Sequence, residues 1–275
     1  MLNIVVCIKQ VPDTTQVRID PDTNTLIREG IPSIINPFDL HALAAAAQIK
    51  DKYGASVTVL TMGPPQAVRA LRKALSFDAD RAVLLSDRDL IGSDTLATSA
   101  ALAAAIRKLA EDKPVDLILC GKQTIDGDTA QVGPGIATRL GFNQITYVGA
   151  IESIDVEAHT IRARRILEAA EEVVKAPLPA LLTILKDIGE PRYAFLPAVI
   201  RGLRADIPVW GVVDLDLDPS EVGLAGSATQ VRRISAPPRR QRGEMIASDD
   251  DKPDRTAHLL LDKLFAADVF GKSTL

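Results

Sequence analysis

Short apolar runs alternate with helical patterns along the first half of the chain, and this alternation constrains the fold more than any other feature. Each apolar run is continuous and bounded by polar or turn residues, as buried strands of a parallel sheet are. Amphipathic segments lie between these runs. The order predicts an α/β domain with a doubly wound, mostly parallel sheet. The expected strands cover residues 2–8, 57–62, 81–85 and 115–120, and the expected helices cover 39–52, 66–77 and 94–111.

The rest of the sequence adds to this pattern. Residues 16–28 alternate apolar and polar side chains around a Pro-Asp-Thr-Asn turn, which predicts a hairpin after the first strand. From about residue 145, strand-like segments with charged turns predict extra strands that extend the sheet, at 146–154, 159–165 and 179–184.

The C-terminal part has a different composition. From Ala205 onward Pro, Gly, Asp and Arg become frequent, and the segment 255–270 is amphipathic again. We therefore expect one nucleotide-binding α/β domain over 1–204 and an extended arm over 205–275. Such an arm, ending in a helix, is expected to pack on a partner subunit.

Composition excludes several classes of protein. The formal net charge is -4, with 47% hydrophobic and 25% charged residues, which argues against a disordered chain and against a general nucleic-acid surface. The first apolar run lacks a preceding basic segment, and no run approaches the roughly 18 residues that a membrane span needs. We expect a soluble, cytoplasmic protein with no nucleic-acid partner and no membrane span.

The cysteines and histidines give no sign of a metal or nucleophilic site. Cys7 and Cys120 each end an expected strand, where small buried thiols are common, so neither a disulfide nor a zinc site is expected. The histidines are His41, His159 and His258, far apart and without ligands at metal spacing. We therefore predict no metal, no catalytic residue and no hydrolytic or group-transfer site.

The segment GKQTIDGDTAQVGP, residues 121–134, follows the fourth apolar run directly. A strand that ends at a glycine and leads through a polar loop into a helix near Asp128 presents free backbone N–H groups, which suit a phosphate. The spacing is neither GxGxxG nor GxxxxGK[ST], and Lys122 stands too early to be a Walker lysine. The alternative interpretation is an ordinary strand-to-helix turn in which Asp128 is the N-cap.

Three other loops are expected at the same edge of the sheet. In Asn36-Pro37-Phe38-Asp39, Asp39 can cap the first helix, but the loops after the first and fourth strands can also share one crevice, where Asn36 would reach a base or ribose. Gly63, after Met62, allows close backbone approach. The segment 92–99 opens a helix with several hydroxyl groups, which would hold a polar part of a ligand or only cap the helix.

The segment Glu190 to Pro197, EPRYAFLP, places Phe195 and Leu196 between two prolines. Apolar residues in a rigid loop often anchor a partner protein. The alternative is a loop folded back on its own core.

These motifs together resemble one known family. VCIKQVPD, INPFDLHAL, TVLTMGPPQ, DLILCGKQTIDGDTAQVGP and EPRYAFLP occur in the order and spacing of the beta subunit of electron transfer flavoproteins, over nearly the whole chain. The resemblance implies an adenine nucleotide alpha hydrolase-like fold and an alpha subunit that carries a mobile flavin domain. It also implies an adenine nucleotide against Cys7, 36–39, Met62 and 121–132, which is AMP in ordinary members and the ADP half of a second FAD in bifurcating members.

With Gly63 and the start of the third helix added, the predicted cofactor site is extensive. It comprises Cys7, Asn36, Pro37, Phe38, Asp39, Met62, Gly63, Asp94, Thr95, Thr98, Gly121, Lys122, Gln123, Thr124, Ile125, Asp126, Gly127, Asp128, Thr129, Ala130, Gln131 and Val132. The resemblance further implies a docking loop for acyl-CoA dehydrogenases over 190–201 with Leu196 as anchor, and a quinone oxidoreductase is the other expected partner. The predicted docking residues are Glu190, Arg192, Tyr193, Phe195 and Leu196.

Two segments indicate the subgroup. TNTLIREGIPSIINP and LLSDRDLIGSDTLATS resemble the bifurcating and nitrogen-fixation-linked members, which implies FAD, NADH as hydride donor, and ferredoxin or flavodoxin as low-potential acceptor. Asp89-Leu90 departs from the aromatic-containing sequence of that subgroup, so backbone donors and hydroxyl groups would position the flavin. The alternatives are a scaffold subunit that holds structural AMP, and a free-standing adenine-nucleotide hydrolase or sensor.

Overall fold

The computed structural model describes residues 1–13, 32–232, 245–246 and 253–269. The chain forms two compact units, Met1–Ile234 and Ser235–Leu275. The hairpin expected over 16–28 lies outside the described residues. The second unit contains helix α6 (Pro253–Ala266), whose residue range largely overlaps that of the helix expected over 255–270.

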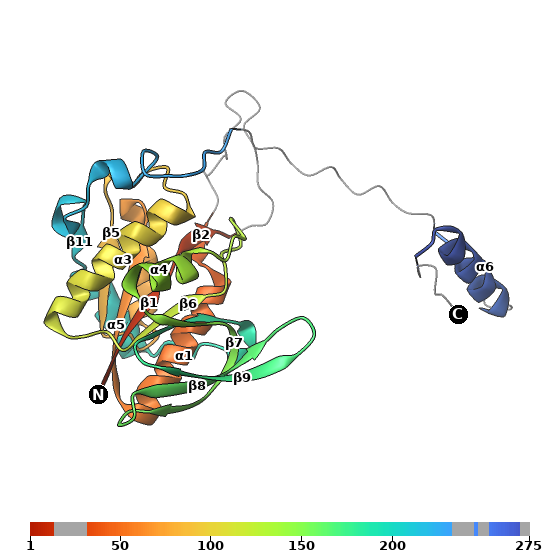
Figure 1. The fold of residues 1–275 in the computed structure, drawn as a ribbon, viewed down its shortest axis with the longest axis horizontal. Helices are drawn as coiled ribbons and strands as arrows, with labels where there is room; N and C mark the ends of the chain where they lie inside the picture. Colours follow the sequence, from red (N-terminus) through yellow and green to blue (C-terminus); the bar gives the residue numbers. More distant parts are fainter. Residues whose placement is uncertain (14–31, 233–244, 247–252, 270–275) are drawn as a thin grey trace. The chain divides into compact units, whose positions relative to one another are not determined.

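A nine-stranded sheet, counted over the described residues, forms the centre of the first unit (Figure 1). Its order is β11-β5-β4-β1-β6-β10-β7-β8-β9, and the pairs up to β7 are all parallel, whereas β7, β8 and β9 pair antiparallel. The predicted doubly wound, mostly parallel sheet with added strands is thus confirmed. The strands are β1 (Leu2–Cys7), β4 (Ala55–Met62), β5 (Arg81–Leu85), β6 (Leu117–Gly121), β7 (Asn143–Asp155), β8 (Thr160–Ile166), β9 (Glu171–Pro177), β10 (Ala180–Ile184) and β11 (Val209–Trp210), with β2 (Gln10–Pro12) and β3 (Ser33–Ile35) pairing separately.

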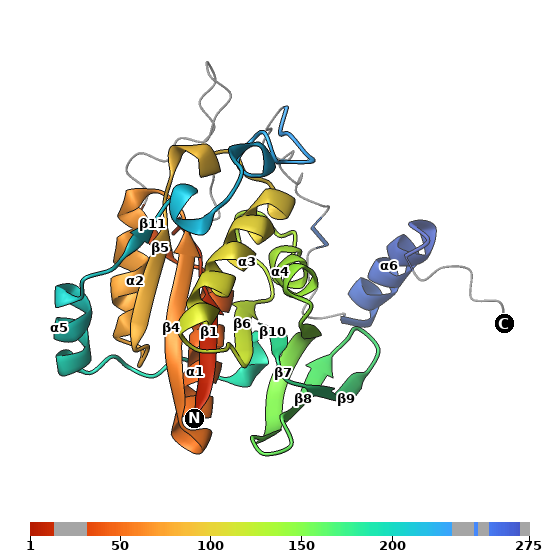
Figure 2. The same cartoon turned by 60° about the vertical axis from the view of Figure 1, so that its left-hand side comes forward.

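Helices cover both faces of this sheet. Because successive side chains of a strand point to opposite faces, Ile4 and Val6 join one apolar core while Val5 joins the other. The first core includes residues of α1 (Pro37–Tyr53) and α2 (Val68–Leu75), and the second includes residues of α3 (Thr95–Asp112) and α4 (Val132–Leu140). Figure 2 shows α3 and α4 in front of the sheet.

Local sequence explains where the long helices begin. Pro37 stands in the first turn of α1, where its missing N–H costs nothing, and Asp94 caps α3 by accepting the N–H groups of Leu96 and Ala97. Alanine-rich stretches favour both helices. Short 3-10 helices cover Pro65–Ala67, Arg88–Leu90, Lys186–Ile188, Val213–Leu215 and Pro219–Glu221.

Apart from the short 3-10 helices, the sequence patterns missed five elements of the described structure, namely β2, β3, β9, β11 and α5. Strand β9 was not expected, and β11 has only two residues, paired with β5 at Leu84 and Leu85. Helix α5 (Leu196–Arg204) occupies part of the segment expected to be a loop, and it packs against α2. Since β11 joins the sheet, the division expected near residue 205 lies inside the first unit.

The order of the strands creates a crevice at one edge of the sheet. The chain leaves β1 through α1 to β4 on one side, and later returns through α3 to β6 on the other side. β1 and β6 are therefore neighbours whose following loops diverge, which is the switch point where open α/β sheets bind ligands. Cys7 and Cys120 are partners in register there, and both are buried, free thiols.

Candidate functional site

A cavity of about 410 Å³ opens at the carboxyl ends of β1 and β6. Its volume lies within the range of small-molecule sites. The loops after β1, β4, β5 and β6 and the starts of α3 and α4 contribute to its wall. The lining residues are Cys7, Ile8, Lys9, Asp39, Met62, Leu90, Gly92, Ser93, Asp94, Thr95, Thr98, Leu102, Cys120, Gly121, Lys122, Gln123, Thr124, Gly127, Thr129, Ala130, Gln131, Val132 and Gly133.

Most of the residues proposed from sequence for a cofactor line this cavity. Those outside its lining are Asn36, Pro37, Phe38, Gly63, Ile125, Asp126 and Asp128. Sequence reasoning missed several lining residues, above all Lys9, because a lysine just beyond a strand is an ordinary surface residue. The others missed are Ile8, Leu90, Gly92, Ser93, Leu102, Cys120 and Gly133.

Asp39 joins the two loops that follow β1 and β6. It lies in the first turn of α1, and the N-cap position is occupied by Asn36, so the expected N-cap role is wrong. Its carboxylate instead accepts the backbone N–H of Lys9 at 2.7 Å and that of Gly121 at 3.1 Å. Burial raises the pKa of Asp39 to about 7, against the opposing effect of these hydrogen bonds and of Lys9.

Gly121 makes this close approach possible. A Cβ added at Gly121 would lie 2.4 Å from Oδ1 of Asp39 and 2.7 Å from the backbone carbon of Phe38. Any larger residue would therefore push the start of α1 away from the end of β6. The glycine that ends the fourth predicted strand thus has a packing function.

Asn36 holds the 121–134 loop in place. Its side chain is fully buried, Nδ2 donates to the carbonyl of Gln123 at 2.8 Å, and Oδ1 accepts the N–H of Ile125 at 3.2 Å. Both ends of the amide are used within the protein. The structure thus places Asn36 behind the loop, where it supports the cavity wall.

The helix after the loop begins later than expected. α4 starts at Val132, and Asp128 and Ala130 have φ angles of 51° and 54°, so Asp128 is in the turning loop and is not the N-cap. In the described structure no side chain caps α4, because Gln131 stands at the N-cap position without a capping hydrogen bond. Val132 and Gly133 line the cavity, so the positive end of the helix macrodipole borders it.

An ion pair connects the loops at the cavity. Nζ of Lys9 lies 2.9 and 2.7 Å from the two carboxylate oxygens of Asp126. Partial burial of Asp126 opposes its ionisation, but the hydrogen bond and charge of Lys9 outweigh this and lower its pKa. The charge of Asp126, which would repel a phosphate, is therefore balanced by the lysine.

The start of α3 is fixed by the chain after β11. The carboxylate of Asp94 accepts N–H and O–H of Thr229 at 2.9 Å, and its own N–H donates to Oγ of Ser227. Oγ1 of Thr95 donates to Oε1 of Gln131 at 2.9 Å, so α3 and α4 meet at the cavity. Thr95 and Thr98 both line it, which leaves hydroxyl groups at the wall.

Neutral groups form the inner wall. The hydrogen bond with Cys7, and then burial, raise the pKa of the Cys120 thiol well above its usual value. The Cys120 thiol is therefore neutral near pH 7, and it lines the cavity together with Cys7, Met62, Leu90 and Leu102. Such a wall suits a flat ring, and the polar loop opposite suits phosphates and hydroxyls.

The predicted docking residues are brought together elsewhere on the first unit. Tyr193, Phe195 and Leu196 are 97%, 69% and 71% exposed, so the alternative of a loop folded back on the core is wrong for them. Leu196 is the first residue of α5, since Pro197 fits the first turn of a helix. Exposed apolar residues continue along α5 at Ile200 and Leu203.

Two other kinds of feature are absent from the described residues. No cluster of His, Cys, Asp and Glu has the arrangement of a metal site in the part of the chain that the structure covers. Among the described helices, none combines the length and apolarity that a membrane crossing requires.

Comparison with known proteins gives a consistent result. The model of the electron transfer flavoprotein domain matches residues 23–215, more than half of the chain. The chain is 52% identical over 266 residues to "Protein FixA" of Azotobacter vinelandii, covering 96% of this chain and 95% of that protein. It is 49% identical to the "Electron transfer flavoprotein subunit beta" of Clostridium acetobutylicum (93% and 95% covered) and 46% identical to that of Megasphaera elsdenii (98% and 100% covered).

Proposed function

The chain belongs to the electron transfer flavoprotein family as a beta-subunit-type member, and from this premise we propose that it binds FAD in the cavity between β1 and β6. The observation that carries the proposal is the uncapped start of α4 bordering a cavity at the switch point of the sheet. Backbone N–H groups and the helix dipole there stabilise a pyrophosphate. The free-standing hydrolase is not proposed for a member of this family.

The residues of the cavity suit both the polar and the ring-shaped parts of an FAD. Thr129, Gln131 and Val132 line the side next to the start of α4, while Cys7, Met62 and Cys120 provide an apolar wall for a ring. Thr95, Thr98 and Thr124 also line the cavity, and their hydroxyl groups are proposed to contact ribose or ribityl oxygens. Lys9 adds a positive charge at the wall, and its pairing with Asp126 keeps the loop nearly neutral.

When bound, the FAD would supply the redox chemistry, with NADH oxidised and one electron passed to the FAD of the alpha subunit and one to ferredoxin or flavodoxin. This chain would bind and orient the flavin, exclude water from its adenine half, and hold the alpha subunit in a heterodimer. Helix α6, in the second unit, is proposed to pack on that subunit. We propose the cytoplasm as its compartment.

The exposed segment 193–196 is proposed to dock an acyl-CoA dehydrogenase or a quinone oxidoreductase. Three exposed apolar side chains in four residues would lose water-exposed surface on docking, and α5 continues the apolar surface. Leu196 would be the anchor.

The alternative function uses the same cavity. A scaffold subunit would hold AMP there as a structural ligand, and electrons would pass only through the alpha-subunit flavin. The volume of the cavity favours this alternative, since about 410 Å³ is ample for a mononucleotide.

The reaction with NADH separates the two functions. We expect NADH, added without oxygen to the purified heterodimer, to bleach the visible flavin absorbance within seconds. In the alternative, NADH leaves the spectrum unchanged, and bleaching requires a reduced acyl-CoA dehydrogenase. An unchanged spectrum with NADH would contradict the bifurcating proposal.

A further inference from the structure

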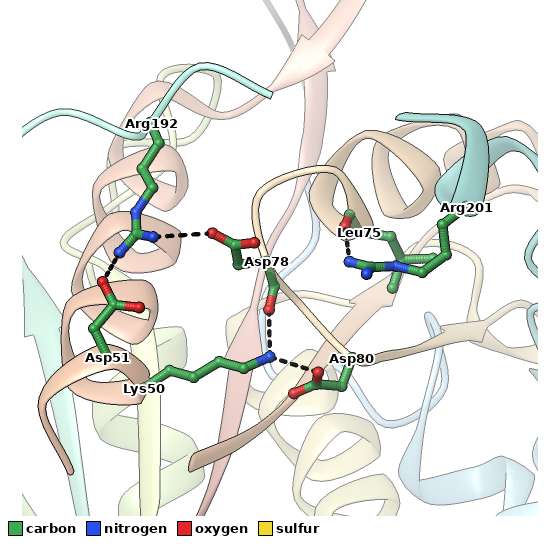
Figure 3. A network of polar contacts seen from close by, with 7 residues as sticks. All are labelled: Lys50, Asp51, Leu75, Asp78, Asp80, Arg192 and Arg201. Carbon is green, nitrogen blue, oxygen red and sulfur yellow. Dashed lines mark hydrogen bonds and ion pairs between the residues drawn. The ribbon is translucent and has the colours of Figure 1, made fainter. Parts of the chain in front are cut away.

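We propose that Arg192 is a positioning residue that fixes the exposed segment 193–196 in the orientation in which it docks. The proposal rests on the docking function proposed above. It arises from an arrangement of polar contacts around the segment, shown in Figure 3, in which the chain is held on both sides of the apolar residues.

The first contact is made by Arg192 itself. One terminal nitrogen of its guanidinium contacts the carboxylate of Asp51 on α1, and the other lies 3.3 Å from Oδ2 of Asp78, in the turn between α2 and β5. The planar fork of an arginine can bind two carboxylates at once, which a lysine cannot do with the same geometry. Arg192 therefore joins the segment to two separate elements.

The two elements that carry these carboxylates are joined to each other by Lys50. Nζ of Lys50, next to Asp51 in sequence, donates to the backbone carbonyl of Asp78 at 2.9 Å and to Oδ1 of Asp80 at 2.5 Å. Asp80 Oδ2 also accepts the N–H of Val57 on β4. The acceptors of Arg192 thus belong to a network connected to the sheet.

The chain before Arg192 lies along the same helix. Nδ1 of His41 is 2.8 Å from the carbonyl oxygen of Gly189, and Nε2 of Gln48 donates to the carbonyl of Ile188 at 3.3 Å. With Asp51, three side chains of α1 contact residues 188–192. This stretch forms the first anchor.

The second anchor follows the apolar residues, on α5. A Cβ at Gly202 would lie 2.5 Å from the carbonyl oxygen of Arg72 on α2, so the two helices approach closely there. Arg201 donates to the carbonyl of Leu75 at 3.3 Å, also on α2. α5 is therefore fixed on α2 through its C-terminal half.

Tyr193, Phe195 and Leu196 lie between these anchors and are largely exposed. A short segment fixed at both ends has less conformational freedom to lose when a partner covers it, which raises affinity. The function of Arg192 follows from this geometry: it limits the freedom of the segment and need not touch the partner.

The test compares two ways of breaking the first anchor. Arg192→Met removes the guanidinium, while the double variant Asp51→Asn with Asp78→Asn keeps Arg192 and removes its charged partners. Leu196→Ala is the matched control, because it removes the apolar side chain proposed to contact the partner and leaves the polar contacts of Arg192 intact. Each variant is made in the heterodimer and examined by hydrogen exchange of the peptide covering 190–197. The apparent affinity for a purified acyl-CoA dehydrogenase is then measured from electron-transfer rates.

We expect both anchor variants to speed exchange of the 193–196 amides about five-fold and to weaken the affinity by a similar factor, as the loss of two exposed ion pairs allows. Leu196→Ala should weaken the affinity without changing exchange. Nucleotide content should stay at the level of the unmodified heterodimer in all of them.

Two results would overturn the proposal. Exchange in Arg192→Met equal to that of the unmodified heterodimer would show that Arg192 does not hold the segment. Lost affinity in Arg192→Met together with full affinity in the double carboxylate variant would make Arg192 a direct partner contact. Full affinity of Leu196→Ala would instead contradict the docking function, and the exchange data would still decide whether Arg192 orders the segment.

Discussion

The cavity between β1 and β6 and the exposed segment 193–196 are held by different kinds of contact. Around the cavity, buried groups meet at close range: Asp39 accepts two backbone N–H groups, and Gly121 leaves no space for a side chain. Around the segment, the guanidinium of Arg192 bridges carboxylates that are substantially exposed. Changes at the buried contacts of Asp39 and Gly121 should therefore alter stability and ligand binding together, whereas changes at the segment should alter partner affinity and leave stability unchanged.

Gly121→Ala should have the largest effect, because the added methyl group meets Asp39 and backbone atoms of Phe38. We expect the free energy of unfolding to fall by about 3 kcal/mol, as in overpacked cores, with loss of nucleotide. Urea denaturation of the heterodimer measures the change. The control is Gly127→Ala, where the added Cβ has its nearest neighbour at 3.4 Å. Equal stability of the two variants would show that the close contact of Gly121 with Asp39 and Phe38 does not constrain the fold.

Leu196→Ala tests the exposed segment 193–196. We expect the complex with an acyl-CoA dehydrogenase to weaken by about 2 kcal/mol, since truncation of a central anchor has that cost. Thermal stability and nucleotide content should not change. Val213→Ala, at a site 88% exposed and in another part of the first unit, is the matched control and should have no effect. Unchanged transfer kinetics in Leu196→Ala would exclude the segment as the docking site.

The pH dependence of stability should report on Asp39. Its pKa is raised to about 7 in the folded protein, so between about pH 4 and 7 the folded state binds more protons there than the unfolded state. The contribution of Asp39 to the free energy of unfolding therefore falls as pH rises through this window, by at most about 1.4 kcal/mol per pH unit. Asp39→Asn should lack this component. The free energy of unfolding of both proteins is measured by urea denaturation from pH 4.5 to 8. The same pH dependence in the unmodified protein and in Asp39→Asn would contradict the raised pKa of Asp39.

The double change Thr95→Val with Thr98→Val should have the smallest effect. It removes two hydroxyl groups from the cavity wall and the hydrogen bond from Thr95 to Gln131. We expect FAD binding to weaken by about 1 kcal/mol, with stability nearly unchanged. Flavin occupancy after dialysis is the measurement, and Thr138→Val on α4, outside the cavity lining, is the control. Full occupancy would exclude these hydroxyls from the site.

The cavity could be predicted largely from sequence because its loops directly follow buried strands. Apolar runs locate the ends of β1 and β6, and a parallel sheet brings those ends to one edge. The predicted start of α4 was wrong because Asp128 is of a residue type that often caps helices. The positive φ angles of Asp128 and Ala130, which keep them outside the helix, depend on the conformation of the whole loop. Lys9 was missed because its pairing with Asp126 spans the two loops.

The region around segment 193–196 was less predictable for a physical reason. Its contacts join residues far apart in the chain, such as Arg192 with Asp51 and Asp78, and exposed charges have no sequence periodicity. Pro191 and Pro197 suggested a rigid loop, whereas Pro197 in fact lies in the first turn of α5. β11 is recognisable only through its pairing with β5.

The nucleotide content of the heterodimer tests the central claim most directly. The chain would be co-expressed with an electron transfer flavoprotein alpha subunit, and the FAD and AMP released on denaturation would be counted per heterodimer. The account predicts two FAD and no AMP. One FAD and one AMP would contradict it and make the cavity a structural AMP site.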